Sequence, residues 1–503
     1  MSAKKVKDNN KTLWIIVYSL IFIGMLVFFG YSHQLIIYDA DDWLFASNTR
    51  SALPEWKSWN PTRVLPETLM SFCAGIGAEF IYPITKDYIG ALAIVFALVL
   101  SGLIVMYFRA MVKYINTKMK LSDFQMLCLL SVLILLHFVI YKRFDSGNKH
   151  MFSEANVTCV FFYTIPALVN SITVLTFATL GEINFFSRKY SVTTRAFLVL
   201  LSYLAINSNM FPSVILMSYV GKYLIMRLIR IIRKRKNVKI TIAAFVKYNI
   251  SALLIVLCWI ISLVFEAGGG RADDVESAGI FANIGDSLKY LVQIVWVMMN
   301  RTYILVVGVF VLMSLIAFFV TSSKREAENK YAKMFIYSAG ALFITSVYLV
   351  LLTAKTSPGY LKRSGVVFSI TFHIMVIAGM SMAYSFKKIK WVTVLMPLVI
   401  FVLFNKTVCI SGTFTAINSA GYDEQKCKEI DEYFIDKVVE ADKKGKTEVT
   451  VKIPKYKTED NWPVACYGNN FMADTLYRHG VTKKRMAIYV EPDKEINKKF
   501  GID

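Results

Sequence analysis

Long apolar runs, separated by short charged or turn-rich segments, dominate this chain up to about residue 408. Most runs hold roughly 18 to 22 residues, the length that an α-helix needs to cross a hydrocarbon core about 30 Å thick. We therefore expect residues 1–408 to form an all-α polytopic membrane domain. The eleven membrane-spanning helices that the pattern predicts cover residues 13–30, 88–108, 124–141, 157–178, 196–207, 209–226, 243–264, 302–320, 334–353, 365–384 and 391–408.

The stretch 196–226 allows two interpretations. Ala196–Ile206 holds only about 11 apolar residues, which is short for a membrane span. One interpretation is a short re-entrant pair that turns at Asn207-Ser208-Asn209, and the other is a single helix kinked at Pro212. A single helix would put one of the two flanking basic clusters outside, against the charge distribution, so the pattern favours the re-entrant pair.

The composition becomes polar from residue 409 onward. A helical repeat of apolar residues comes first, followed by an alternating segment that is typical of a half-buried strand. The pattern predicts a small α/β domain over residues 409–503, on the outer face of the membrane. Its expected elements are helices around 430–438 and over 470–479, and strands over 448–453 and 486–490.

Charge placement sets the expected topology. The chain of 503 residues has a formal net charge of +22 and a mean hydropathy of +0.49. About 25 Lys and Arg residues fall in the N-terminus and alternate short loops, against about 13 in the other loops. This alternation indicates membrane topology rather than a nucleic-acid partner. It predicts a multi-pass protein of the cell membrane with a cytoplasmic N-terminus and an extracytoplasmic C-terminus.

The first outer loop, residues 31–87, carries an unusual acidic stretch. Asp39, Asp41 and Asp42 are followed directly by Trp43, and we call Tyr38–Trp43 the acidic loop. Carboxylates packed together at a membrane interface repel one another, and partial burial raises their pKa values. A carboxylate tuned in this way can accept the proton of a sugar hydroxyl. The alternative is a solvated loop whose acids cap a short helix.

The outer loops also contain a few cations that could meet one ligand. Arg271 follows three glycines, which allow close backbone approach, and a guanidinium suits bidentate contact with a phosphate. Trp59 precedes another of these cations in the first outer loop. The cations that we expect to contact a phosphate are Arg63, Arg271, Lys362 and Arg363.

These motifs resemble the GT-C superfamily of integral-membrane glycosyltransferases. The similarity rests on Asp41-Asp42-Trp43 after the first span, Trp59-Asn60-Pro61-Thr62-Arg63, Phe162-Tyr163-Thr164-Ile165-Pro166, and Arg363. Such enzymes transfer a sugar from a polyprenyl-phosphate carrier to an acceptor on the outer face, usually with inversion. The resemblance implies a GT-C-like membrane domain and a bacterial cell-envelope glycan or lipid-linked acceptor.

The same resemblance suggests roles for individual residues. It implies that Asp41 is the general base, with support from Asp42 or Asp39. A lipid phosphate leaves without protonation, so one base and several cations are sufficient. Asp39-x-Asp41 could also bind a divalent cation. The remaining substrate- or phosphate-binding residues are expected to be Asp39, Trp43, Trp59, Arg63, Arg271, Lys362 and Arg363.

Two other functions fit an outer-face site of this kind. A polysaccharide polymerase or ligase would share the site and differ mainly in its donor. A lipid-linked glycan flippase would be a transporter without a catalytic acid. The sequence shows no internal repeats, and no Asp, Glu, Lys or Arg lies in the middle of its apolar runs; both absences disfavour a transporter.

Overall fold

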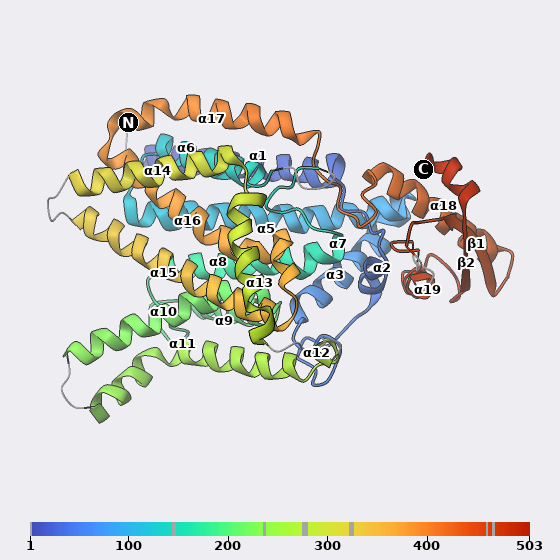
Figure 1. Cartoon of the computed structure of the whole chain (residues 1–503), viewed down its shortest axis with the longest axis horizontal. Coiled ribbons are helices and arrows are strands. Elements are labelled where there is room, and N and C mark those ends of the chain that lie inside the picture. The colour runs from blue at the N-terminus through green and yellow to red at the C-terminus, as the bar shows by residue number, and fades with distance from the viewer. Residues whose placement is uncertain are drawn as a thin grey trace.

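The computed structural model describes residues 3–142, 147–234, 238–273, 280–320, 326–458, 461–464 and 468–502. The chain is mostly helical, with a small region of strands near its C-terminus. Long helices form a bundle, and a compact α/β unit covers one end of it (Figure 1).

In the part of the chain that the structure describes, the bundle contains seventeen α-helices, several of them very short. They are α1 (Ala3–Val27), α2 (Ala40–Ser47), α3 (Val64–Ile76), α4 (Tyr82–Thr85), α5 (Tyr88–Met119), α6 (Asp123–Val139), α7 (Val157–Cys159), α8 (Ile165–Leu180), α9 (Val192–Ile206), α10 (Met210–Lys234), α11 (Val238–Ala267), α12 (Gly270–Asp273), α13 (Ile280–Gln293), α14 (Arg301–Val320), α15 (Glu326–Lys355), α16 (Ser364–Lys388) and α17 (Lys390–Ser411). The centre of the bundle is formed by α8 and α16, which are buried along most of their length.

Nine helical stretches among the described residues are long and apolar enough to cross a membrane, judged by length and composition. Several long apolar helices thus support insertion into a membrane. The nine stretches are Lys11–Ser32, Val64–Thr85, Tyr88–Met119, Val157–Leu180, Ile242–Ala267, Arg301–Val320, Lys330–Lys355, Ser364–Lys388 and Lys390–Ser411.

The nine candidates among the described residues do not confirm the predicted count of eleven spans. The predicted spans 124–141 and 196–207 appear as α6 and α9, apolar helices of only 17 and 15 residues. The predicted span 209–226 lies within the longer helix α10, which is not among the nine candidates. Conversely, Val64–Thr85 is a candidate span in the structure, although the sequence predicts that these residues belong to the first outer loop. Its moderate hydropathy of 1.3, with Glu67 and Glu79 inside, explains why the pattern concealed it.

The ambiguous stretch 196–226 contains two helices joined by a tight turn. The helical conformation is interrupted at Asn207–Asn209, the turn position that the sequence predicts. The Asn209 side-chain amide donates to the Phe162 carbonyl at 2.8 Å, and the Asn170 amide donates to the Ala205 carbonyl at 3.0 Å. These bonds pair polar groups at the end of α9 and the start of α10. The structure therefore contains two separate helices here and not a single kinked one.

The C-terminal unit consists of α18 (Glu424–Lys443), β1 (Glu448–Pro454), α19 (Gly468–Arg478), β2 (Ala487–Asp493) and α20 (Lys494–Phe500). Strands β1 and β2 pair in parallel, with Val451 opposite Val490, and α19 connects them. Each element predicted between 430 and 490 is present. The prediction succeeds because the spacing of apolar residues within a short amphipathic segment already reveals whether it forms a helix or a strand.

The C-terminal unit docks onto the first outer loop. The Thr475 hydroxyl of α19 donates to the main-chain oxygen of Trp43 at 2.6 Å. At the start of α5, the Tyr88 hydroxyl forms a hydrogen bond of 2.7 Å with His479. Both ends of the segment 31–87 therefore lie at the end of the bundle that carries the C-terminal unit (Figure 1).

Candidate active site

Asp39 is a buried anchor at the start of α2. Its carboxylate accepts a hydrogen bond from the Asn156 amide at 2.9 Å and another from the Ser419 hydroxyl. Burial raises the pKa of Asp39 to about 6, although these hydrogen bonds oppose the shift. Asp39 thus joins α2 to the segments on either side of it rather than facing solvent.

Asp42 is also completely buried, and both of its oxygens accept hydrogen bonds. Its Oδ1 accepts from the Thr158 N–H at 2.7 Å and the Thr158 hydroxyl at 2.6 Å. Its Oδ2 accepts from the main-chain N–H groups of Tyr38 and Asp39 at 3.2 and 3.3 Å. Burial and the nearby Asp39 raise the pKa of Asp42 to about 7. These contacts give Asp42 a structural task.

Asp41 differs from its two neighbours. It is exposed, and its carboxylate accepts no hydrogen bond from the described residues. Although the Asp41 side chain reaches solvent, partial desolvation by the surrounding protein raises its pKa, and the positive charge of Arg271 opposes this shift. Asp41 is therefore the one acid of the three whose carboxylate is available to a ligand.

Two of the four expected cations contact Tyr360 and a third, Arg63, acts on it electrostatically; we call Arg63, Arg271 and Arg363 the arginine cluster. Arg271 donates a hydrogen bond of 3.2 Å to the Tyr360 hydroxyl. The guanidinium carbon of Arg363 lies 4.6 Å from the centre of the Tyr360 ring. Burial alone would raise the pKa of Tyr360, but the charges of Arg271, Arg363 and Arg63 lower it. All three arginines thus act electrostatically on one hydroxyl.

The cluster brings like charges close together. Arg63 is buried, with its guanidinium carbon 5.2 Å from the centre of the Phe162 ring. Burial lowers its pKa, and the charge of Arg271 lowers it further. A bound anion would relieve this repulsion. The fourth expected cation, Lys362, is exposed and lies 4.4 Å from the centre of the Tyr290 ring instead.

The three glycines before Arg271 do allow close backbone approach, but the approaching group is the first outer loop itself. A Cβ atom on Gly269 would lie 2.6 Å from Pro61 Cδ, and one on Gly270 would lie 3.2 Å from Trp59 Cε3. The Arg271 N–H also donates to the Trp59 carbonyl at 3.3 Å. Close packing thus holds Arg271 beside the first outer loop, where Asp41 also lies.

The two expected tryptophan contacts have different surroundings. Trp43 is buried, and its ring stacks on Tyr88 with centroids 6.3 Å apart. The Trp43 ring therefore packs the acidic loop against α5. Trp59 is 54% exposed, so its ring remains accessible beside Gly270.

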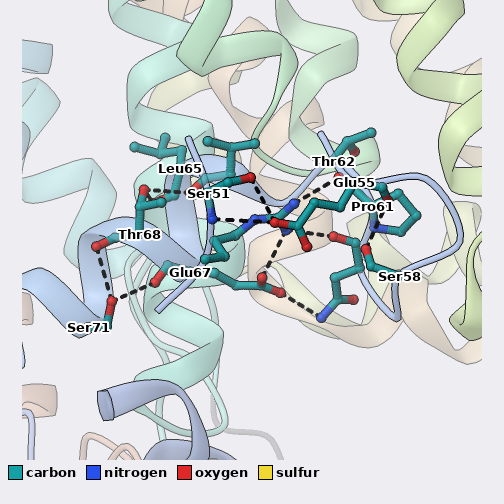
Figure 2. Close-up of polar contacts among 12 residues, drawn as sticks. Ser51, Glu55, Ser58, Pro61, Thr62, Leu65, Glu67, Thr68 and Ser71 are labelled. Carbon is teal, nitrogen blue, oxygen red and sulfur yellow. Dashed lines mark hydrogen bonds and ion pairs between the residues drawn. The ribbon is translucent and has the colours of Figure 1, made fainter. Parts of the chain in front are cut away.

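Sequence reasoning missed a buried ion pair that shapes the first outer loop (Figure 2). Arg50 contacts Glu67 at 2.9 Å and donates to the carbonyls of Asn60 and Pro61 at 2.7 and 3.0 Å. The Asn60 amide donates to the other Glu67 oxygen at 2.8 Å. A lone glutamate in an apolar helix needs such a partner, and Glu67 was the available signal.

Glu154 is a second buried acid that the sequence did not single out. It accepts a hydrogen bond of 2.8 Å from the Thr164 hydroxyl. It packs so closely against Gly365, at the start of α16, that any Cβ there would overlap its carboxylate. Burial raises the pKa of Glu154 to about 8, with Arg363 among the charges that oppose the shift.

The acids of this loop do not form a suitable donor set for a divalent cation. Asp39 and Asp42 direct their oxygens to hydrogen-bond donors, which leaves Asp41 beside a positive charge. Among the residues that the structure describes, no group of three His, Cys, Asp or Glu residues is arranged to hold a metal ion. We therefore assign no step to a metal.

The arrangement can perform one kind of chemistry well. An accessible carboxylate can remove a proton, while neighbouring arginines stabilise negative charge on a departing phosphate. Asp41 and the arginine cluster are the groups here whose residue types suit this chemistry. No family model, curated protein or solved structure matches the chain.

Proposed function

We propose that this chain is an integral-membrane glycosyltransferase. It would transfer a sugar from a polyprenyl-phosphate carrier to a cell-envelope glycan or a lipid-linked acceptor on the outer face of the membrane. The observation that carries the proposal is the contrast between Asp41 and its neighbours. Asp39 and Asp42 are buried and hydrogen-bonded, whereas Asp41 is exposed beside Arg271.

In the proposed reaction, Asp41 accepts the proton of an acceptor hydroxyl. The hydroxyl oxygen forms a bond to the anomeric carbon of the donor sugar, and the bond from that carbon to the phosphate oxygen breaks. The electron pair of the broken bond remains on the lipid phosphate, whose charge Arg271, Arg363 and Arg63 stabilise. A single displacement of this kind inverts the anomeric centre.

The proposal includes a topology with the N-terminus in the cytoplasm and the C-terminal unit outside. The helices α6, α9 and α10 would complete eleven spans, while Val64–Thr85 would lie along the outer face. Its support is that His33 and Asp87, near the two ends of the segment 31–87, contact Glu424 and Lys428 of α18. A reporter that is active only outside the cell, fused after residue 503, tests the side of the C-terminus.

Transfer by the full-length protein in proteoliposomes is the direct test. The donors are a panel of polyprenyl-phosphate monosaccharides with radiolabelled sugars, and the acceptor is envelope glycan from a deletion strain. We expect Asp41→Asn to lower transfer by about 10² to 10⁴-fold, because the amide cannot accept the proton. The matched control is Asp436→Asn, which changes an exposed acid on α18.

The outcomes separate the enzyme from the other functions. Full transfer by Asp41→Asn protein with a normal melting temperature would exclude Asp41 as the base. Movement of a lipid-linked glycan across the bilayer without any transfer, unchanged in Asp41→Asn, would identify a flippase. Transfer of whole glycan chains instead of single sugars would identify a polymerase or ligase.

A further inference from the structure

A cavity lined by basic residues lies at the other end of the helix bundle, far from the C-terminal unit. It has a volume of about 230 Å³, and its lining residues come from the C-terminal ends of α5, α8 and α10 and the first part of α15. These parts of the helices lie at the end of the bundle opposite the C-terminal unit (Figure 1). We call it the basic cavity. The cationic side chains that line it are Lys118, Lys222, Arg227, Arg230 and Lys333.

The positive charge in the basic cavity has no counter-charge among the described residues. The described lining contains no Asp or Glu, and none of its five cations pairs with a described carboxylate. Aromatic rings support two of them instead. Lys222 Nζ lies 4.7 Å from the centre of the Tyr219 ring, and the guanidinium carbon of Arg227 lies 5.2 Å from that of Tyr223.

A ring beneath a cation stabilises the charge without using its hydrogen-bond donors. The N–H groups of Lys222 and Arg227 therefore remain available to a ligand. Like charges gathered at the end of an apolar bundle repel one another, and a bound anion removes that cost. Guanidinium and ammonium groups together are a donor set that suits phosphate oxygens.

A smaller, mostly apolar recess adjoins the basic cavity. The recess has a volume of about 30 Å³ and shares Tyr219 and Lys222 with the basic cavity. The walls of this recess include Val174, Phe372 and Val376. The recess holds only about the volume of one water, so the geometry fits an anionic head group in the basic cavity, and the apolar chains of a membrane lipid would lie outside it. The volume of about 230 Å³ exceeds the roughly 30 Å³ share of one water several-fold.

We propose that the basic cavity binds the phosphate head group of an anionic membrane lipid. Basic cavities between membrane helices are known to suit such head groups, since each cation near an anionic surface contributes to binding. The site uses residues of α5, α10 and α15, and none of these belongs to the arginine cluster or the acidic loop. The proposal therefore does not depend on glycosyl transfer.

Native mass spectrometry of the full-length protein in detergent tests the proposal. The probes are phosphatidylglycerol, phosphatidylcholine and inorganic phosphate, each titrated separately. We expect phosphatidylglycerol to bind at least about 10-fold more tightly than phosphatidylcholine, which carries no net charge. The double variant Arg227→Gln/Arg230→Gln should lose most of this preference.

The matched control is Lys113→Gln/Arg188→Gln, which removes two exposed cations that do not line the basic cavity. It should keep the preference, and both double variants should keep the wild-type melting temperature. Equal binding of the two lipids would overturn the proposal, as would equal losses in both double variants. Binding of inorganic phosphate without phosphatidylglycerol would also overturn it and identify a soluble phosphate ligand.

Discussion

Thr158 donates two hydrogen bonds to Asp42, one from its main-chain N–H at 2.7 Å and one from its hydroxyl at 2.6 Å. They join the first residues of α7 to α2 and fill the Oδ1 side of the carboxylate. Asp41, the preceding residue, accepts no hydrogen bond from the described residues. Adjacent carboxylates thus have separate tasks, since one holds the loop in place and the other remains open to a ligand.

The structural task of Asp42 predicts a loss of stability in Asp42→Asn. An amide offers one oxygen, so its NH₂ group must face an N–H donor of Thr158, Tyr38 or Asp39. Leaving such groups unsatisfied costs about 1 to 3 kcal/mol. Thermal unfolding in detergent should show a lower melting temperature than for wild type or Asp436→Asn. An unchanged melting temperature with lost transfer would instead give Asp42 a chemical role.

The electrostatic effect of Arg271 on Asp41 predicts that transfer depends on pH differently when Arg271 is replaced. Its positive charge lowers the pKa of Asp41, so removing that charge should raise this pKa. A base is active when deprotonated, and the acidic limb of the plot of kcat/KM against pH should therefore move to higher pH in Arg271→Gln. Lys362→Gln is the control, because Lys362 lies over Tyr290. A limb that stays in place would show that Arg271 does not act on the titrating group.

The packing of Gly269 predicts that even a methyl group disturbs the site. In Gly269→Ala the new Cβ would lie 2.6 Å from Pro61 Cδ, so the first outer loop must move. Overpacking of this kind costs about 1 to 3 kcal/mol, and a displacement of about 1 Å can reduce the rate about 10²-fold. Melting temperature and transfer should both fall. Gly285→Ala, which adds a Cβ with nothing within 4 Å, should change neither.

Glu154 predicts how stability depends on pH. Its pKa is about 8 in the folded chain against an ordinary value of 4.5, so the folded chain binds this proton more tightly than the unfolded chain. The contribution of Glu154 to the free energy of unfolding is therefore full below about pH 4.5 and falls as the pH rises towards 8. Glu154→Gln should make the melting temperature less dependent on pH in this range.

The control for that experiment is Glu429→Gln, an exposed position on α18. It should retain the wild-type decrease in melting temperature between about pH 5 and pH 8, the range that lies between the ordinary pKa of a glutamate and the pKa of Glu154 in the folded chain. If Glu154→Gln and Glu429→Gln show equal slopes, the buried proton of Glu154 does not contribute to the pH dependence.

The local parts of the fold were readable from the sequence. Ile430, Phe434 and Val438 recur at helical spacing, and the structure buries all three on α18. The turn at Asn207–Asn209 is likewise where the polar residues predict it. The helix Val64–Thr85 was hidden because Glu67 interrupts its apolar pattern, and its partner Arg50 lies outside that window of sequence.

Residue type and local order were sufficient to predict a helical chain with long apolar segments, a small C-terminal unit and a concentration of acids in the first outer loop. Periodicity and charge act over a few neighbouring residues, so they are visible without a fold. Only the tertiary structure separates Asp41 from Asp42, because the difference arises from Thr158 and Arg271. These partners are distant in the chain, and burial and hydrogen bonding depend on which distant segments the fold brings together.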